Sequence, residues 1–598
     1  MKLIHYFICI LFTLTTISLG SCHDDDNSIQ SGITHQSWTE GTALEITPSK
    51  ILSVTFNAAA KWTATTNSNW CSILTPSGEK GQSTLQLSTT TGTSVERTSI
   101  ITIKVDGYST ISFDVKQNIG EAVLSEDMKV NTKVAQYLRE MYLWNDEYKT
   151  LKLDYTKEYS AFFYEPLKNM TTNTLDKKRY TDSDGKTDYN LFSYINKRAP
   201  ITRTRAAKLV EKELSYSFGI TGATLINLRS SSSESIFYIC IQGIYPDSPA
   251  AAAGIKRGAM ISKINGEKLN KSNLEKYYYS LVLPDKALNL TLTEDIIEKG
   301  EKKGTKDVSL TSKAMYLNPV ITSKVDEING HKIGYLVYSE FDASFDQELF
   351  DAFKNFKKQN VTDLILDLRY NGGGHTLSAN LLASCIAADA SLGKTFTSLR
   401  FNKERMEKRN NKQEIDLFAY PNHYRNLDTP LTDGGLGLKR VYCLVSGNTA
   451  SASELVINSL RGIDLEVILI GEKTRGKNVG MEYEDYAVEG YIYRIAPITF
   501  QSYNAKGFGD YENGFEPDAG LKIKETNPFN EEGKFYILKD YGTNEEPLYA
   551  KAIELIIGKN PMKSATTRGA GKTLQGWELN APALHRPGYD GMLKKYEE

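Results

Sequence analysis

Three short stretches of the sequence carry residue types that could perform chemistry. The first is Asn448-Thr-Ala-Ser-Ala-Ser-Glu454, which follows an apolar run and opens a helical one. Ser451 would sit where the N–H groups and the dipole of a helix favour negative charge, so an oxyanion formed there would be stabilised. The same position also suits a serine that only caps the helix, and this motif alone does not decide between the two.

The second stretch is Gly471-Glu-Lys-Thr-Arg-Gly-Lys477, which places Lys477 26 positions after Ser451. A strand–helix–strand return of that length brings both loops to one edge of a sheet, where open α/β sheets place their sites. A lysine that is neutral can act as a general base. Lys473 and Arg475 are nearby alternatives, and by itself the stretch also reads as an exposed basic turn.

The third stretch is Asp367-Leu-Arg-Tyr-Asn-Gly-Gly-Gly-His375, directly after an apolar run. Glycines let backbone amides approach a ligand closely. No Lys-Ser/Thr pair follows them and the GxGxxG spacing is absent, so an oxyanion-binding loop suits the stretch better than a phosphate cradle.

The elements that must position these loops alternate between strands and helices from about Leu310 to Gly558. Runs of Val, Ile and Leu separated by helical patterns indicate an α/β core. The predicted strands are 332–337, 363–368, 441–445 and 466–470, and the predicted helices are 347–359, 377–388 and 453–461.

The three motifs, taken in this order, resemble those of the C-terminal processing peptidases, also called tail-specific proteases. Gly514-Phe-Glu-Pro-Asp518 resembles the Gly-x-x-Pro-Asp segment of that family. The resemblance covers about 121–558 and implies a serine endopeptidase with a ClpP/crotonase-like core and no cofactor or metal. The site residues that it implies are the nucleophile Ser451, the general base Lys477, and the oxyanion donors Ala452 and either Gly373 or Gly374.

The sequence departs from the pattern of this family at one position. Many members carry a Gln four residues after the lysine to orient it, and here that residue is Met481. Glu482, Glu484 or no residue at all takes that role. Because tricorn-type relatives use Ser–His chemistry, His375 is a rival base, and the alternative is a residue at the rim of the site.

The segment 214–294 resembles a PDZ domain, an α+β fold. Ser248-Pro-Ala-Ala-Ala-Ala-Gly254 reads as a short helix with a glycine stop, and an Asn-Gly hairpin follows at 265–266. Ala259 departs from the resemblance, since the family usually has Asp there. The resemblance implies capture of free, apolar C-termini of protein substrates. The residues that it places in the carboxylate loop are Phe218, Gly219 and Ile220.

Three further segments precede this domain. The helical spacing of apolar residues predicts a small helical cap over 121–212. Short alternating strands predict a β-sandwich over 43–118, which resembles the BACON family in Asn69-Trp-Cys71 and Arg97. That resemblance implies glycan contact or a spacer role, with the tryptophans either stacking on sugars or packing in the core.

The N-terminus reads as a secretory signal peptide over 1–21. The end of this segment, Leu19-Gly-Ser-Cys22, resembles a bacterial lipobox, which implies lipidation of Cys22 and a tether over 22–42. The run Asp24-Asp-Asp26 resembles an export tag of surface lipoproteins. We therefore expect a cell-envelope lipoprotein of the outer membrane, displayed on the surface or facing the periplasm. The role of the tail, 559–598, stays open.

Composition excludes some functions. Lys plus Arg number 71 and Asp plus Glu 73, so no basic excess supports nucleic acid as a partner. No His cluster or calcium-loop spacing predicts a metal. Besides a peptidase, two alternatives stay open: a non-catalytic carrier of the same fold and a glycan-adhesion lipoprotein. The cysteines expected to be buried thiols are Cys71, Cys240, Cys385 and Cys443.

Overall fold

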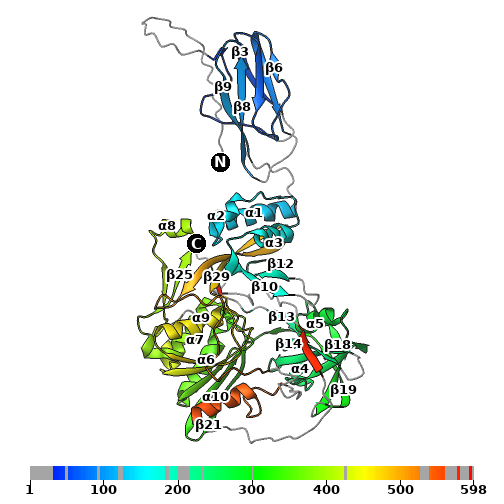
Figure 1. Ribbon diagram of the computed structural model, residues 1–598, viewed down its shortest axis with the longest axis vertical. Coiled ribbons are helices and arrows are strands. Elements are labelled where there is room, and N and C mark those ends of the chain that lie inside the picture. The colour runs from blue at the N-terminus through cyan, green and yellow to red at the C-terminus, as the bar shows by residue number, and fades with distance from the viewer. Residues whose placement is uncertain are drawn as a thin grey trace, which may run out of the picture. The chain divides into compact units, whose positions relative to one another are not determined.

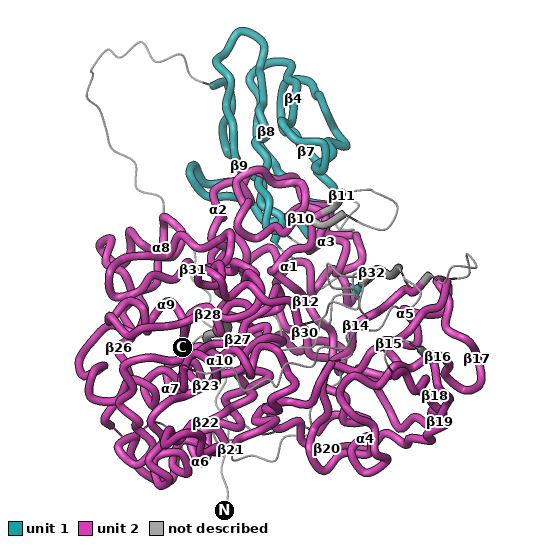
Figure 2. Tube along the Cα trace, turned by 60° about the horizontal axis from the view of Figure 1, so that its bottom comes forward, with its two compact units in different colours: residues 1–125 teal, residues 126–598 magenta. Residues whose placement is uncertain are grey.

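The chain forms two compact units, residues 1–125 and residues 126–598, each described here by itself (Figure 2). The predicted signal peptide and Cys22 lie outside the described residues. The computed structural model describes residues 31–47, 51–89, 95–118, 125–181, 187–198, 212, 214–229, 235–298, 301–422, 424, 427–525, 538–558, 575–579 and 592–595.

The first unit is a β-sandwich of two sheets, as its alternating sequence predicts. Alternate residues of each long strand are buried, which gives the unit one apolar core between the sheets. One sheet has the order β1 (Ile33–Thr34), β3 (Ile51–Ala58), β7 (Gly81–Ser88) and β5 (Ser72–Ile73). The other has the order β2 (Leu44–Glu45), β9 (Ile111–Gln117), β8 (Arg97–Val105), β4 (Trp62–Thr66) and β6 (Ser77–Gly78).

The two candidate sugar-stacking tryptophans of this sandwich differ in their surroundings. Trp62 is buried in the core, and its Nε1 donates a hydrogen bond to Ser83 Oγ at 2.8 Å. Trp70 is half-buried, and the Arg97 guanidinium lies 4.5 Å from its ring centroid. Trp62 is therefore a core residue, and the exposed part of Trp70 shares its surface with Arg97.

The predicted helical cap is correct only for its first part. Helices α1 (Glu126–Met141), α2 (Asn145–Thr150) and α3 (Tyr159–Asn169) form as expected. For the rest of the cap the prediction of helix is wrong, because the chain continues as the strands β10 (Lys177–Thr181), β11 (Thr187–Leu191) and β12 (Tyr194–Arg198). The reason is tertiary: β12 pairs along its whole length with β30 (Tyr491–Ala496), a partner far along the chain.

Residues 214–316 form a β-rich domain whose main sheet has its own apolar core. The Asn265-Gly266 turn joins β16 to β17 with both residues at positive φ, as expected. The sheet extends past the predicted boundary at 294, because β18 continues into a hairpin with β19. The elements are β13 (Leu214–Ser217), β14 (Ile220–Arg229), β15 (Ser235–Ile244), α4 (Pro249–Ala252), β16 (Met260–Ile264), β17 (Glu267–Lys268), α5 (Leu274–Val282), β18 (Asn289–Glu298), β19 (Glu301–Thr311) and β20 (Lys313–Tyr316).

The α/β core is built on one largely parallel sheet, and its predicted strands and helices are confirmed (Figure 1). The sheet order is β21 (Val320–Ile328), β22 (His331–Tyr338), β23 (Asp363–Asp367), β27 (Arg440–Val445) and β28 (Glu466–Gly471). The helices that pack on it are α6 (Asp346–Lys358), α7 (Thr376–Ala387), α9 (Ala452–Gly462) and α10 (Pro547–Ile557).

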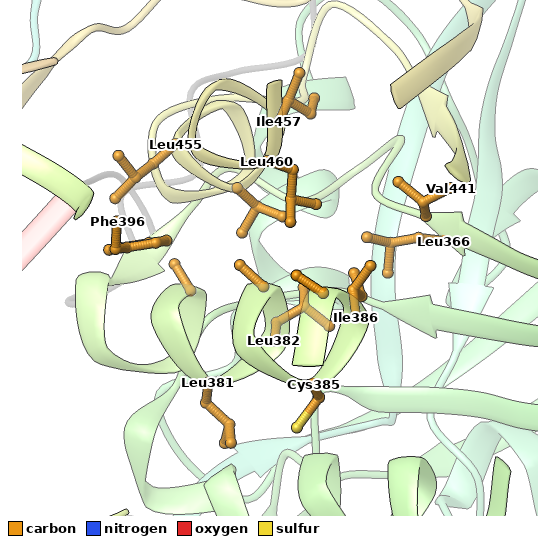
Figure 3. Close-up of a cluster of buried hydrophobic side chains, with 14 of the residues drawn as sticks. Leu366, Leu381, Leu382, Cys385, Ile386, Phe396, Val441, Leu455, Ile457 and Leu460 are labelled. Atoms are coloured by element: carbon orange, nitrogen blue, oxygen red, sulfur yellow. The ribbon is translucent and has the colours of Figure 1, made fainter. Parts of the chain in front are cut away.

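Alternation along the central strands divides the helices between the two faces of this sheet. Leu366 and Val441 pack in one cluster with α7 and α9, which Figure 3 shows. Ile365 and Leu444, one position away from residues of that cluster, pack in a second cluster that contains α10. Both faces are thus covered, as expected of a parallel sheet.

A second sheet lies beside the core and carries the strands that follow the candidate motifs. Its order is β12, β30, β29 (Val479–Val488), β31 (Ile498–Tyr503), β25 (Thr395–Phe401) and β26 (Glu414–Leu417). The remaining described elements are β24 (Gly374–His375), α8 (Lys403–Lys408), the short 3-10 helices 174–176, 343–345, 388–391 and 431–433, and the tail strands β32 (Gln575–Leu579) and β33 (Met592–Lys595).

Two further findings concern the cysteines and the length of the apolar helices. The four cysteines of the described ranges are free and buried, as expected. Within the part of the chain that the structure describes, no helix is long and apolar enough to cross a membrane.

Candidate active site

The three loops that carry the candidate motifs are hydrogen-bonded to one another. Thr449 Oγ1 donates to the Leu368 carbonyl at 2.8 Å, and the Ala450 N–H donates to the Asn371 carbonyl at 3.1 Å. The Arg475 N–H donates to the Thr449 carbonyl at 2.9 Å. The structure therefore brings together stretches that are separate in the sequence, at the carboxyl ends of β23, β27 and β28.

Ser451 has an unusual backbone conformation. It precedes α9 with φ 60° and ψ −113°, a region that side-chain-bearing residues rarely adopt. Its side chain is buried, and among the described residues its Oγ has no hydrogen-bond partner. Ser451 is the N-cap of α9 and shares a capping box with Glu454, which accepts from the Ser451 N–H. Its Oγ is left without a hydrogen-bond partner among the described residues, so capping through the backbone does not account for this oxygen.

Glu454 joins the Ser451 loop to the Lys477 loop. Its Oε2 accepts hydrogen bonds from the backbone N–H of Ser451 at 2.9 Å and of Lys477 at 2.8 Å. Its Oε1 accepts from Thr474 Oγ1 at 2.6 Å and from the Gly476 N–H at 2.7 Å. Burial raises the pKa of Glu454, and these donors oppose that effect.

Glu454 belongs to the sequence motif around Ser451, but no role was predicted for it. The signal that could have found it is a carboxylate that directly follows a run of small residues in a buried-looking helix. Such a carboxylate needs donors, and the nearest loops supply them.

Lys477 is buried, with only 2% of its surface exposed. Its Nζ lies 4.6 Å from the ring centroid of Phe192, and it interacts electrostatically with the buried carboxylate of Asp176. The alternative base Lys473 is largely exposed and pairs with Glu516 at 3.1 Å. Of these two lysines, the structure places only Lys477 inside the protein.

Neither carboxylate considered for orienting Lys477 is directed to it. Glu482 pairs with Arg405 at 2.5 Å, and Glu484 pairs with Lys133 at 2.7 Å. Met481, at the position where the resembled family often has Gln, is buried in the apolar cluster beneath the cap. Phe192, for which the sequence predicted no role, contacts the Lys477 ammonium through its ring, and the charge of Lys477 favours the ionised form of the buried Asp176.

Gly373 lies directly against the serine. A Cβ added to it would be 2.8 Å from Ser451 Cβ and 3.0 Å from the Ala452 nitrogen, and its φ is +115°. Its own N–H donates to Asn371 Oδ1 at 2.9 Å, within the loop. Of the two glycines considered as oxyanion donors, Gly373 thus has its N–H engaged within the loop.

A buried ionic cluster anchors this glycine loop. The Arg369 guanidinium donates to Asp367 Oδ2 at 2.6 Å and to Glu546 Oε1 at 2.8 Å, and also pairs with Glu525. Arg257, from the 214–316 domain, pairs with the same Glu525. Burial works against the charge of Arg369, but the neighbouring carboxylates prevail and hold its pKa well above its usual range.

His375 takes no part in a bond to the serine. Its backbone N–H donates to the Phe341 carbonyl at 2.7 Å, and the residue precedes α7. Since Ser451 Oγ has no partner among the described residues, His375 does not hold it. Lys477 makes no hydrogen bond to this oxygen either.

The segment considered for peptide binding is mostly interior. Phe218 and Ile220 are buried in the core of the 214–316 domain. The Gly219 N–H donates to Ser217 Oγ at 2.9 Å, and a Cβ at Gly219 would be 1.9 Å from Ser248 Cβ. Glycine is thus required there, and the edge of β14 that follows is the surface on which a peptide could pair.

Lys178, on β10, is a further lysine at this site that the sequence analysis missed. Its Nζ donates to the Arg475 carbonyl at 3.1 Å, and burial lowers its pKa to about 8. No local pattern could have found it, because only the pairing of the cap with the second sheet brings it to the loop. In the described ranges, no group of His, Cys, Asp and Glu residues could hold a metal ion.

Comparisons with known proteins found similar peptidases. Residues 332–521 match the family model Peptidase family S41. The chain is 31% identical over 234 residues to a carboxyl-terminal-processing protease of Picosynechococcus sp. strain PCC 7002, covering 39% of this chain and 49% of that protein. It is 25% identical over 340 residues to the carboxy-terminal processing protease CtpA of Bacillus subtilis strain 168, covering 56% and 64%.

A solved structure shares the fold. The crystal structure of a candidate S41 protease from Bacteroides fragilis NCTC 9343 aligns with a TM-score of 0.53 at 23% identity, over 74% of this chain and 99% of that one. The chain spans about half the length of the two cyanobacterial relatives that it matches. These similarities support a serine-type peptidase of family S41 for the core.

Proposed function

We propose that this protein is a serine endopeptidase of family S41 in which Ser451 is the nucleophile and Lys477 the general base. The observation that carries the proposal is the carboxylate of Glu454, since one of its oxygens holds the backbone of both residues. The buried Ser451 Oγ, unpartnered among the described residues and lying against Gly373, supports the same role.

The reaction then follows from the geometry. Neutral Lys477 takes the proton of Ser451 Oγ as this oxygen attacks a peptide carbonyl, and the backbone N–H groups of Ala452 and Gly374 stabilise the oxyanion. The lysine returns the proton to the leaving amine, which leaves an acyl-enzyme. Water, deprotonated by the same lysine, then releases the acyl group and restores Ser451. Asp176 and Phe192 hold the amine in place.

We further propose that the 214–316 domain acts as a PDZ domain that binds substrates through their C-termini. Its strand β14 begins directly after Gly219, the glycine of the expected carboxylate loop. A peptide added to the edge of β14 that does not pair with β15 would be recognised mainly through its backbone. The Arg257–Glu525–Arg369 contacts would connect this domain with the oxyanion loop.

The cellular site is also a proposal. Lipidation at Cys22 would anchor the chain to the outer membrane, on the surface or facing the periplasm, where the β-sandwich would act as a spacer or contact glycans. When cells are fed a labelled fatty acid, the parent chain should incorporate the label and the Cys22→Ser variant should not. Label that persists in the variant would contradict anchoring at this cysteine.

A carrier function is the second candidate, but no observation favours it. A carrier would have no use for a buried serine at strained φ whose backbone shares one carboxylate with that of a buried lysine, and both residues are present.

Cleavage of unfolded polypeptides tests the proposal. The chain starting after Cys22 should cut unfolded proteins with apolar C-termini faster than the same proteins ending in charged residues, as followed by gel and mass spectrometry. No cleavage by the chain, with or without its tail, would contradict the peptidase proposal. Equal rates on both sets of substrates would contradict recognition of C-termini alone.

Glu454→Gln should lower kcat by about 10²-fold, the scale expected when a catalytic group moves by about 1 Å. The described partners of this carboxylate are all donors, so a glutamine NH₂ would face an N–H and push the two loops apart. Glu466→Gln, the same change at an exposed position of β28, should leave kcat unchanged. If Glu454→Gln has the kcat of the parent, the Glu454 carboxylate does not align Ser451 with Lys477.

A further inference from the structure

The C-terminal tail of the chain pairs with one edge of the 214–316 sheet, at strand β14. Strand β32 pairs antiparallel with β14, with Gln575 opposite Arg229 and Leu579 opposite Leu225 (the red arrow in Figure 1). The other edge of β14 pairs with β15. The tail therefore lies on the edge available for an added strand, and it runs towards the end of β14 that adjoins Gly219.

A second segment of the same tail enters the candidate active site. Strand β33 pairs parallel with β24 on one side and with β29 on the other. Met592 lies opposite both Gly374 and Gly480, so two residues without side chains flank its backbone. Because Gly373 precedes β24, the amino end of β33 lies at the end of β24 that adjoins Ser451.

From these two pairings we infer that the tail is an intramolecular inhibitor that binds as a substrate polypeptide would. This inference rests on the proposed function and extends it to the regulation of the same site. Both contacts are made through the backbone, on a sheet edge and in a slot between two strands, so any extended polypeptide meets the same groups. A substrate must displace the tail to reach Ser451.

The covalent link to the core makes this competition strong. A segment in the same chain as its binding site acts at an effective concentration on the order of 1 mM, so substrates at micromolar levels compete poorly with it. The two contacts, at β14 and between β24 and β29, also support each other, since release of one leaves the other bound. We therefore expect low activity of the complete chain.

Removal of the tail tests the inference. A chain ending at Gly558, the C-cap of α10, should show kcat/KM at least about tenfold above that of the complete chain, through a lower KM. In the complete chain, Leu593→Pro should have the same effect, because β33 is paired on both edges and proline removes a backbone donor. Ala583→Pro, between the two strands in the sequence, is the matched control and should change nothing.

Equal kcat/KM in the complete chain, the shortened chain and Leu593→Pro would overturn the inference. Mass spectrometry of the complete chain before the assay should find Glu598 present. A tail already lost from the parent but kept in Ser451→Ala would also overturn it, because a tail that is cut away does not hold the site closed.

A binding measurement separates this inference from the proposed function. A labelled peptide of residues 575–598 should bind the shortened chain that also carries Ser451→Ala, as measured by fluorescence anisotropy. The same peptide with Leu593→Pro should bind more weakly. Absence of binding would overturn the tail inference whatever the activity. Binding without cleavage of any substrate by any chain would support the tail inference and contradict the peptidase proposal.

Discussion

Ser451→Ala is expected to lower kcat for peptide cleavage by about 10⁴-fold or more, because the acyl-enzyme cannot form. Ser459→Ala is the matched control, since Ser459 is a buried serine on the same helix, α9, whose Oγ has no hydrogen-bond partner among the described residues. It should keep parent kcat. Initial rates on one unfolded substrate, with and without the tail, give both values.

Loss of the base should lower kcat by a similar factor. The effects of removing residues that act as a unit do not add, because either loss alone stops the same step. We expect Lys477→Ala to lower kcat about as much as Ser451→Ala, and the double variant to be no worse than either. Lys473→Ala, at the exposed lysine of the same loop, should keep parent kcat. Cleavage that survives Lys477→Ala would point to Lys178 or His375 as the base, and each would then be replaced.

Arg369→Ala is expected to lower the free energy of unfolding by about 3–5 kcal/mol, the range for removing one partner of a buried ion pair. The variant would leave the buried carboxylates of Asp367 and Glu546 without the guanidinium that they share. Arg369→Lys should recover only part of the loss, because an ammonium cannot bind two carboxylates through a planar fork. Urea unfolding of each chain, followed by circular dichroism, measures the differences.

The control for this experiment is Arg409→Ala, the same change at a partly exposed ion pair with Glu414. Exposed pairs contribute about 1 kcal/mol or less, so its midpoint should stay near that of the parent. If Arg369→Ala lowers the free energy of unfolding only as little as Arg409→Ala does, the glycine loop does not depend on the ionic cluster.

Much of the α/β core could be predicted from the sequence, because its strands and helices are set by local patterns. The apolar run 363–368 and the helical spacing over 377–388 each act within one element, and the structure places β23 and α7 there. The order of the three motifs along the chain also pointed to one edge of the sheet. Loops that follow neighbouring parallel strands meet at that edge whatever the details of their side chains.

Local sequence patterns gave wrong predictions where a strand pairs with a partner far along the chain. The residues of β12 were predicted as part of a helical cap, yet they form a strand because β30, almost three hundred residues later, completes their hydrogen bonds. Lys178 reaches the Arg475 carbonyl only through the same arrangement. The sequence also left open what orients Lys477, and it assigned no role to the tail.

The sequence by itself determined which residues could react, since a serine, a lysine and a glycine loop are chemical facts of the chain. Only the tertiary structure decided how they are held, because alignment depends on groups brought from afar. One carboxylate, Glu454, fixes the two loops, and Arg369 fixes the third. The structure also pairs the tail with β14 and with β24 and β29. Backbone pairing of this kind leaves no pattern in the sequence from which it could be predicted.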